Sequence, residues 1–85
     1  MVSFSYVIKD EQGIHARPAG LLVKAASGLE SKIMLEKGGK KGDAKKIFGI
    51  MSLAAKKGDE IQVTVEGTKE EADAEIIRKF LEENL

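Results

Sequence analysis

Hydrophobic residues follow two distinct periods along the chain, and each period predicts a different kind of secondary structure. Within 2–8 and 60–66 every second position is hydrophobic, which predicts two half-buried β-strands. The apolar run from Ile33 to Leu35 predicts a third strand over 32–37. Gly38 and Gly39 then predict a hairpin turn, and the polar residues 40–43 fit a short return strand at a sheet edge.

Three other stretches have the spacing of amphipathic helices. Positions 19, 22, 23 and 26 fall on one face of a helix over 16–27, which we expect Gly28 to end in a left-handed conformation. A shorter helix is predicted over 45–53 in spite of Gly49. Thr68 and Glu71 have the spacing of a capping box, which predicts a final helix whose early acidic residues complement its dipole. That helix is expected to bury five hydrophobic side chains: Ala72, Ile76, Ile77, Phe80 and Leu81.

The order of these elements is strand, helix, strand, strand, helix, strand, helix. It predicts an α+β fold in which three helices pack on one face of a four-stranded antiparallel sheet. The 85 residues contain no internal repeat and no linker, so we expect 1–85 to form a single domain.

Composition removes several classes of function. Fourteen basic residues offset fourteen acidic ones, which argues against a nucleic-acid-binding protein. The chain has no Cys and only one His, so we expect no disulfide, no metal site and no cofactor. No apolar run approaches the roughly 20 residues of a membrane helix, and the first residues lack the features of a secretory signal. We therefore expect a cytoplasmic protein without membrane insertion.

The stretch from Gly13 to Ala19 carries the most chemical information. His15 stands where a loop becomes a helix, and Pro18 fits the first helical turn because an amide there has no acceptor in the helix. The amides of Ala16 and Arg17 are then free donors at the positive end of the helix dipole. Together with the Arg17 guanidinium, they predict an anion site beside His15.

A phosphoryl acceptor is one interpretation of this arrangement. An imidazole is largely neutral near pH 7, so a ring nitrogen of His15 can attack a phosphoryl group without a general base. Such a transfer chiefly requires that the charge on the phosphoryl oxygens be stabilised, which the two amides and Arg17 can do. The alternative is that His15 is only a solvated loop residue or a helix cap. A metal ligand is the weakest interpretation, because no second His or Cys exists.

Two further features concern the surface. The predicted helix over 45–53 is too short to bury all its apolar residues, so either a docking patch or scattered surface side chains should result. A run of lysines in and around it could attract an acidic partner, although the favoured explanation is a solvated sheet edge whose lysines discourage pairing with another strand. The run comprises Lys37, Lys40, Lys41, Lys45 and Lys46.

The segment from Gly13 to Ala19 resembles the active-site motif of HPr, the histidine-containing phosphocarrier family of the bacterial sugar phosphotransferase system. The segment from Lys45 to Leu53 resembles the second helix of that family, and Gly67 before an acidic final helix also fits. The likeness covers nearly the whole chain. It implies an open-faced β-sandwich, which agrees with the element order above.

The resemblance also implies a role. His15 would accept phosphate through Nδ1 from phosphorylated enzyme I and pass it to enzyme IIA domains, with Arg17 and the amides of Ala16 and Arg17 holding the phosphate. The protein would then be a stoichiometric intermediate and not an enzyme, and we expect a monomer. The implied contact surface for partners comprises Gly20, Lys24, Ser27, Ile47, Phe48 and Met51.

Lys46 departs from a common family pattern. Many Gram-positive members carry a serine at this position, which a regulatory kinase phosphorylates. Lysine cannot accept that phosphate, so no such regulation is expected at Lys46. This change keeps open an alternative, a regulatory docking module with the same fold. A nitrogen-related paralogue of the relay is a further alternative.

Overall fold

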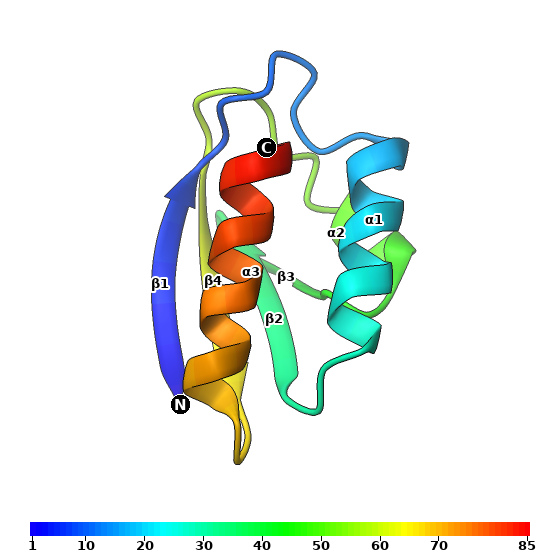
Figure 1. Cartoon of the computed structure of the whole chain (residues 1–85). Coiled ribbons are helices and arrows are strands. Elements are labelled where there is room, and N and C mark those ends of the chain that lie inside the picture. Colours follow the sequence, from blue (N-terminus) through cyan, green and yellow to red (C-terminus); the bar gives the residue numbers. More distant parts are fainter.

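The computed structural model describes all 85 residues and contains four strands and three helices (Figure 1). The elements are β1 (Val2–Val7), α1 (Ala16–Ser27), β2 (Lys32–Lys37), β3 (Lys40–Asp43), α2 (Ile47–Met51), β4 (Glu60–Glu66) and α3 (Glu70–Asn84). The strands form one antiparallel sheet in the order β1-β4-β2-β3. The helices pack against one face of it, so the predicted α+β architecture is confirmed.

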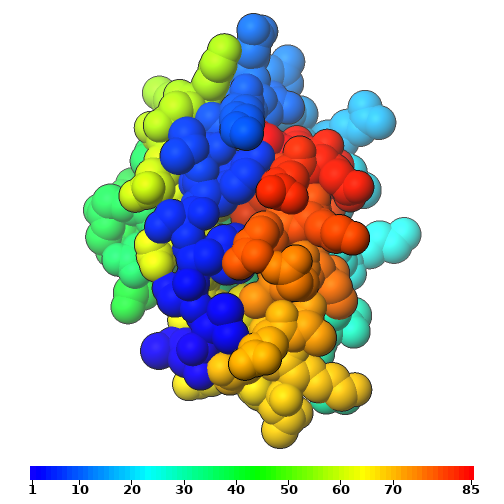
Figure 2. All heavy atoms as spheres, turned by 60° about the vertical axis from the view of Figure 1, so that its left-hand side comes forward, coloured from blue at the N-terminus to red at the C-terminus, as the bar shows by residue number.

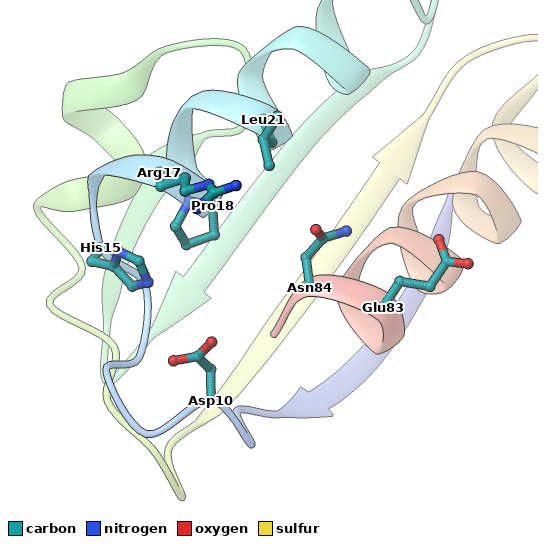
Figure 3. A pocket seen from close by; sticks show the side chains of 7 residues that line it. All are labelled: Asp10, His15, Arg17, Pro18, Leu21, Glu83 and Asn84. Carbon is teal, nitrogen blue, oxygen red and sulfur yellow. The ribbon is translucent and has the colours of Figure 1, made fainter.

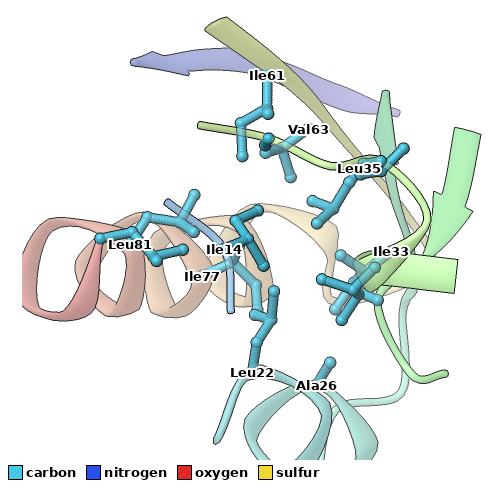
Figure 4. Close-up of a cluster of buried hydrophobic side chains, with 14 of the residues drawn as sticks. Ile14, Leu22, Ala26, Ile33, Leu35, Ile61, Val63, Ile77 and Leu81 are labelled. Carbon is cyan, nitrogen blue, oxygen red and sulfur yellow. The ribbon is translucent and has the colours of Figure 1, made fainter. Parts of the chain in front are cut away.

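The core lies between the sheet and the two longer helices (Figure 4). Ile61, Val63 and Val65 of β4 point into it from alternate positions, as the period of two predicted. Their neighbours lie on the opposite, polar face, where Gln62 accepts a hydrogen bond from Ser5 Oγ and donates one to Ser3 Oγ. β1 lies alongside α3 (Figures 1 and 2). Because β1 is an edge strand, its inward-facing residues Val2, Phe4 and Tyr6 are only partly buried.

The expected left-handed end of the first helix is wrong. Gly28 has φ −81° and ψ −4°, a right-handed conformation. The chain leaves α1 through a tight turn in which Leu29 N–H donates to the Ala26 carbonyl at 3.0 Å, and this turn needs no positive φ. A left-handed residue occurs instead at Ala54, with φ 51°, where the chain turns after α2.

The second helix is shorter than the predicted 45–53. The Asp43 carboxylate accepts from the Lys45 amide at 2.8 Å and the Asp43 carbonyl accepts from the Lys46 amide at 3.0 Å, so these residues form a turn. Helical geometry therefore begins at Ile47. Gly49 is tolerated because α2 packs backbone against backbone: a Cβ on Gly42 of β3 would lie 2.2 Å from the Gly49 carbonyl oxygen.

The predicted capping box at Thr68 and Glu71 is also wrong. Lys69 occupies the N-cap position without a side-chain cap, and Glu70 Oε1 instead accepts from the Gly67 amide at 3.2 Å. The helix therefore begins at Glu70, one residue later than a cap at Thr68 would place it.

The buried face of α3 differs in part from the predicted one. Ile77 and Leu81 are buried as expected and Phe80 is partly buried, but Ala72 is exposed and Ile76 is 46% exposed. The reason is a polar contact: Asp73, only 4% exposed, turns inward and accepts hydrogen bonds from Ser31 through Oδ2. Fixing Asp73 inside rotates Ala72 and Ile76 outward.

Candidate functional site

His15 lies at the N-cap of α1, where the sequence predicted a change from loop to helix. Its backbone is extended (φ −111°, ψ −177°) and its carbonyl accepts from the Ala19 amide at 3.0 Å. The residue is half-buried, and its ring forms no hydrogen bond within the chain. The ring faces a surface hollow and is not packed in the core (Figure 3).

The loop before His15 is anchored by its neighbours. The Ile14 amide donates to the Ala55 carbonyl at 2.9 Å, and the Ile14 side chain is buried in the core. Gly13 has φ 67°, and a Cβ there would lie 2.3 Å from the Ala55 carbonyl oxygen. Only glycine fits this close approach, so Gly13 fixes where the chain enters α1.

The start of α1 presents unpaired donors, as the sequence predicted. The amides of Ala16 and Arg17 donate no hydrogen bond within the chain, and Pro18 has no N–H to donate. The Arg17 side chain is exposed and forms neither a hydrogen bond nor an ion pair within the chain. Two amide dipoles and the positive helix end therefore follow His15 directly in the chain, and the free guanidinium lines the same hollow as the imidazole, an arrangement that favours an anion.

Four of the residues around this hollow, Asp10, Leu21, Glu83 and Asn84, were not anticipated from the sequence. Its volume is about 290 Å³, and it is lined by Asp10, His15, Arg17, Pro18, Leu21, Glu83 and Asn84 (Figure 3). Asp10 comes from the loop after β1, while Glu83 and Asn84 come from the last turn of α3. No local pattern links Glu83 and Asn84 to His15, because only the packing of α3 beside α1 joins positions almost seventy residues apart. Asp10 followed three positions later by Gly13 is a pattern typical of a turn, which could have marked Asp10 as a loop residue but not as part of a site.

The apolar residues of α2 divide in the way that favours a docking patch. Ile50 and Leu53 are buried, whereas Ile47 and Met51 are each 37% exposed and Phe48 is 86% exposed. Because Gly42 and Gly49 bring α2 close to β3 on one side, the other side of the helix faces solvent. We call Ile47, Phe48 and Met51 the α2 patch.

The remaining predicted contact residues lie along the outer side of α1. Lys24 and Ser27 are exposed and Gly20 is half-buried, with open space where a Cβ would stand. Their spacing of four and three residues places them on one face of the helix. Lys46 is exposed at the N-cap of α2 and makes no side-chain cap.

The lysine run does not form one free surface. Lys45 Nζ donates to the Leu29 carbonyl at 2.9 Å, and Lys37 Nζ lies 3.0 Å from Asp59 Oδ2. Lys40, Lys41 and Lys46 are exposed. Two of the five lysines are thus used within the fold.

No group of three or more His, Asp or Glu side chains is close enough to hold a metal ion. None of the three helices is both long and apolar enough to cross a membrane.

Comparisons with known proteins agree on one family. Residues 2–83 match the family described as "PTS HPr component phosphorylation site". The chain is 40% identical over 82 residues to the phosphocarrier protein HPr of Treponema pallidum, covering 96% of this chain and 93% of that protein. It is 42% identical over 82 residues to the HPr-like protein Crh of Halalkalibacterium halodurans, covering 96% of this chain and 98% of the relative.

Solved structures give the same result. A crystal structure of HPr from Thermoanaerobacter tengcongensis matches with a TM-score of 0.92 and 39% identity, covering 99% of this chain and 94% of that one. A crystal structure of an HPr dimer from the same organism matches with a TM-score of 0.77 and 40% identity, covering 98% of this chain and 95% of that one. Dimers therefore exist among the similar proteins, which makes the expectation of a monomer doubtful.

Proposed function

The chain belongs to the HPr family of phosphocarrier proteins, and from this premise we propose that it carries a phosphoryl group on His15 from enzyme I to enzyme IIA domains of the sugar phosphotransferase system. The observation that carries the proposal is the half-buried imidazole of His15 beside two unpaired amides and the unpaired Arg17 guanidinium. The carrier acts in the cytoplasm, once per phosphate, and has no turnover of its own.

This geometry supports a direct transfer of the phosphoryl group between two imidazoles. The lone pair of His15 Nδ1 attacks the phosphorus atom of the donor's phosphohistidine, a new N–P bond forms, and the donor's N–P bond breaks with its electron pair returning to the donor imidazole. The phosphoryl oxygens then lie near the amides of Ala16 and Arg17 and the guanidinium of Arg17. Transfer to an acceptor histidine is the same step in reverse.

The α2 patch provides the surface for both partners. Exposed apolar side chains around Phe48 can be buried by a donor and later by an acceptor, while Gly20, Lys24 and Ser27 border the contact from α1. One surface that serves two partners in turn requires fast dissociation. A small, mostly apolar contact suits that requirement.

Phosphate labelling tests the proposal. The chain is incubated with enzyme I, phosphoenolpyruvate and Mg²⁺, and acid-labile phosphate is located by mass spectrometry. Wild type should gain one phosphate on His15, and a His15→Ala variant should gain none. Failure of wild type to label with its cognate enzyme I would overturn the function, and a labelled His15→Ala variant would overturn the site.

A regulatory docking module is the second candidate, and the likeness to the HPr-like protein Crh favours it. Lys46 in place of a phosphorylatable serine fits a protein that is not controlled by a kinase at that position. This candidate would be preferred if the unphosphorylated chain bound a regulator tightly and phosphorylation of His15 left that affinity unchanged. A nitrogen-related paralogue differs only in the enzyme I that labels the chain.

A further inference from the structure

Two carboxylates line the hollow in which the proposed phosphoryl group would lie. Asp10 and Glu83 share it with His15 and Arg17, and Figure 3 shows the Asp10 carboxylate pointing into the space below the imidazole. Neither carboxylate lies within 4.0 Å of Arg17, so the obvious ion pair does not form. The hollow therefore contains a negative charge that no cation within the chain neutralises at close range.

Asp10 is held in place by its own loop. Its Oδ1 atom accepts from the Gln12 amide at 2.8 Å, and its carbonyl accepts from the Gly13 amide at 2.9 Å. Its amide donates to the Leu85 carbonyl at 2.8 Å. Asp10 is half-buried, whereas Glu83 is exposed and makes no hydrogen bond within the chain. Asp10 is therefore the fixed charge of the hollow, whereas no contact within the chain holds the Glu83 carboxylate.

We propose that Asp10 raises the phosphoryl-transfer potential of His15 by repelling the phosphoryl group that His15 carries. This inference rests on the proposed function, because it concerns the energy of the phosphohistidine itself. Arg17 and the two amides attract the phosphoryl dianion, and attraction alone would hold it too well to be passed on. A fixed carboxylate at the same hollow opposes that attraction in the loaded protein and has no such effect in the empty one.

The expected size of the effect is limited by the solvent around the hollow. The hollow is open to solvent, so the repulsion between a carboxylate and a phosphoryl dianion is reduced by water and by salt. A change of about three- to tenfold in the phosphorylation equilibrium is the scale for such a partly screened pair. Glu83 should contribute less, since its carboxylate is exposed and no hydrogen bond or ion pair holds it near the phosphate.

The transfer step remains balanced without any added reactant. When the phosphoryl group leaves, the N–P bond to His15 breaks, a new N–P bond to the acceptor histidine forms, and the electron pair stays on His15. Asp10 takes no proton and forms no bond. It acts only through its charge, so its effect must weaken with ionic strength.

Asp10→Asn is the test variant, because the side-chain amide keeps an oxygen for the Gln12 N–H and preserves the turn. Glu11→Gln is the matched control: it changes the net charge equally, one residue away, at a side chain that is 88% exposed and lies outside the hollow. Each variant is equilibrated with enzyme I at a fixed ratio of phosphoenolpyruvate to pyruvate. The phosphorylated fraction is then measured by mass spectrometry at low and high KCl.

Asp10→Asn should shift the equilibrium toward the phosphorylated form by about three- to tenfold at low salt, and the shift should shrink at high salt. The equilibrium of Glu11→Gln should match that of wild type. The equilibrium of Glu83→Gln should lie between those of wild type and Asp10→Asn. The inference is overturned if Asp10→Asn matches Glu11→Gln, or if its shift does not depend on salt, while wild type labels normally on His15. If wild type does not label at all, the proposed function fails and takes this inference with it.

Discussion

Removing the Asp73 carboxylate should destabilise this fold more than any other single change at a charged residue. Asp73 is 4% exposed, and its Oδ2 atom accepts from Ser31 Oγ at 2.6 Å and from the Ser31 amide at 3.2 Å. These bonds tie the start of β2 to the first turn of α3. In an Asp73→Ala variant both Ser31 donors lose their partner in a region that water does not reach, since Ser31 is itself buried.

The cost can be estimated from those two bonds. A hydrogen bond to a charged group contributes about 1.5–3 kcal/mol, and the longer amide bond should lie at the low end. Part of this is offset because the variant no longer buries a carboxylate. We expect a net loss of about 3 kcal/mol in the free energy of unfolding. A small domain should then melt about 15 °C lower.

The assay is urea denaturation followed by circular dichroism, with Glu71→Ala as the control for loss of an acidic residue at an exposed position of the same helix turn. A double-mutant cycle with Ser31→Ala should give a coupling energy of about 1.5–2 kcal/mol between the two side chains. The reasoning is refuted if Asp73→Ala costs no more than Glu71→Ala, or if the coupling energy is zero.

Three other predictions concern Arg17, the α2 patch and the ion pair between Asp59 and Lys37. Arg17→Ala should slow phosphoryl transfer about tenfold or more while leaving the melting temperature within about 2 °C of wild type, because the Arg17 side chain is exposed and forms no hydrogen bond or ion pair within the chain; a large fall in melting temperature would contradict this. Phe48→Ala should raise the apparent Michaelis constant for partner proteins about tenfold without loss of stability, since the side chain is 86% exposed, and unchanged partner kinetics would refute the α2 patch. The Asp59 carboxylate accepts from the Lys56 amide and from Lys37 Nζ, and both contacts lower the pKa of its carboxyl. The stability that ionised Asp59 contributes is therefore present above the pKa of Asp59 in the unfolded chain, and it is lost as the pH falls through the pKa of Asp59 in the folded protein. Asp59→Asn should therefore reduce stability in denaturation at neutral pH and match wild type near about pH 2; an equal deficit at both pH values would rule out the ionic origin.

Much of the fold could be predicted from the sequence because its signals are local. The period of two in β1 and β4 and the helical spacing in α1 each lie within one element, and the paired glycines lie in the short turn between β2 and β3. The chemistry around His15 is local for the same reason. The imidazole, the free amides and Arg17 all lie within the first helical turn and the residue before it.

Turn and cap conformations were less predictable. The sequence favours Gly28 as the left-handed residue, but the short turn to Leu29 leaves it right-handed, and Ala54 adopts φ 51° instead. A glycine only permits a left-handed conformation. Whether the chain uses it depends on where the next element must begin, which is a property of the packed structure.

What the sequence determined by itself was the order and type of the elements, the α+β fold class and the placement of His15, two free amides and Arg17 at the start of the first helix, because each depends on residues a few positions apart. Only the tertiary structure decided that Asp73 turns inward to Ser31, which side of α2 remains exposed, and that Asp10, Glu83 and Asn84 gather around His15. Apart from Asp10, which belongs to the loop just before His15, the residues that meet in this way are far apart in the chain, and their geometry exists only once the helices have packed against the sheet.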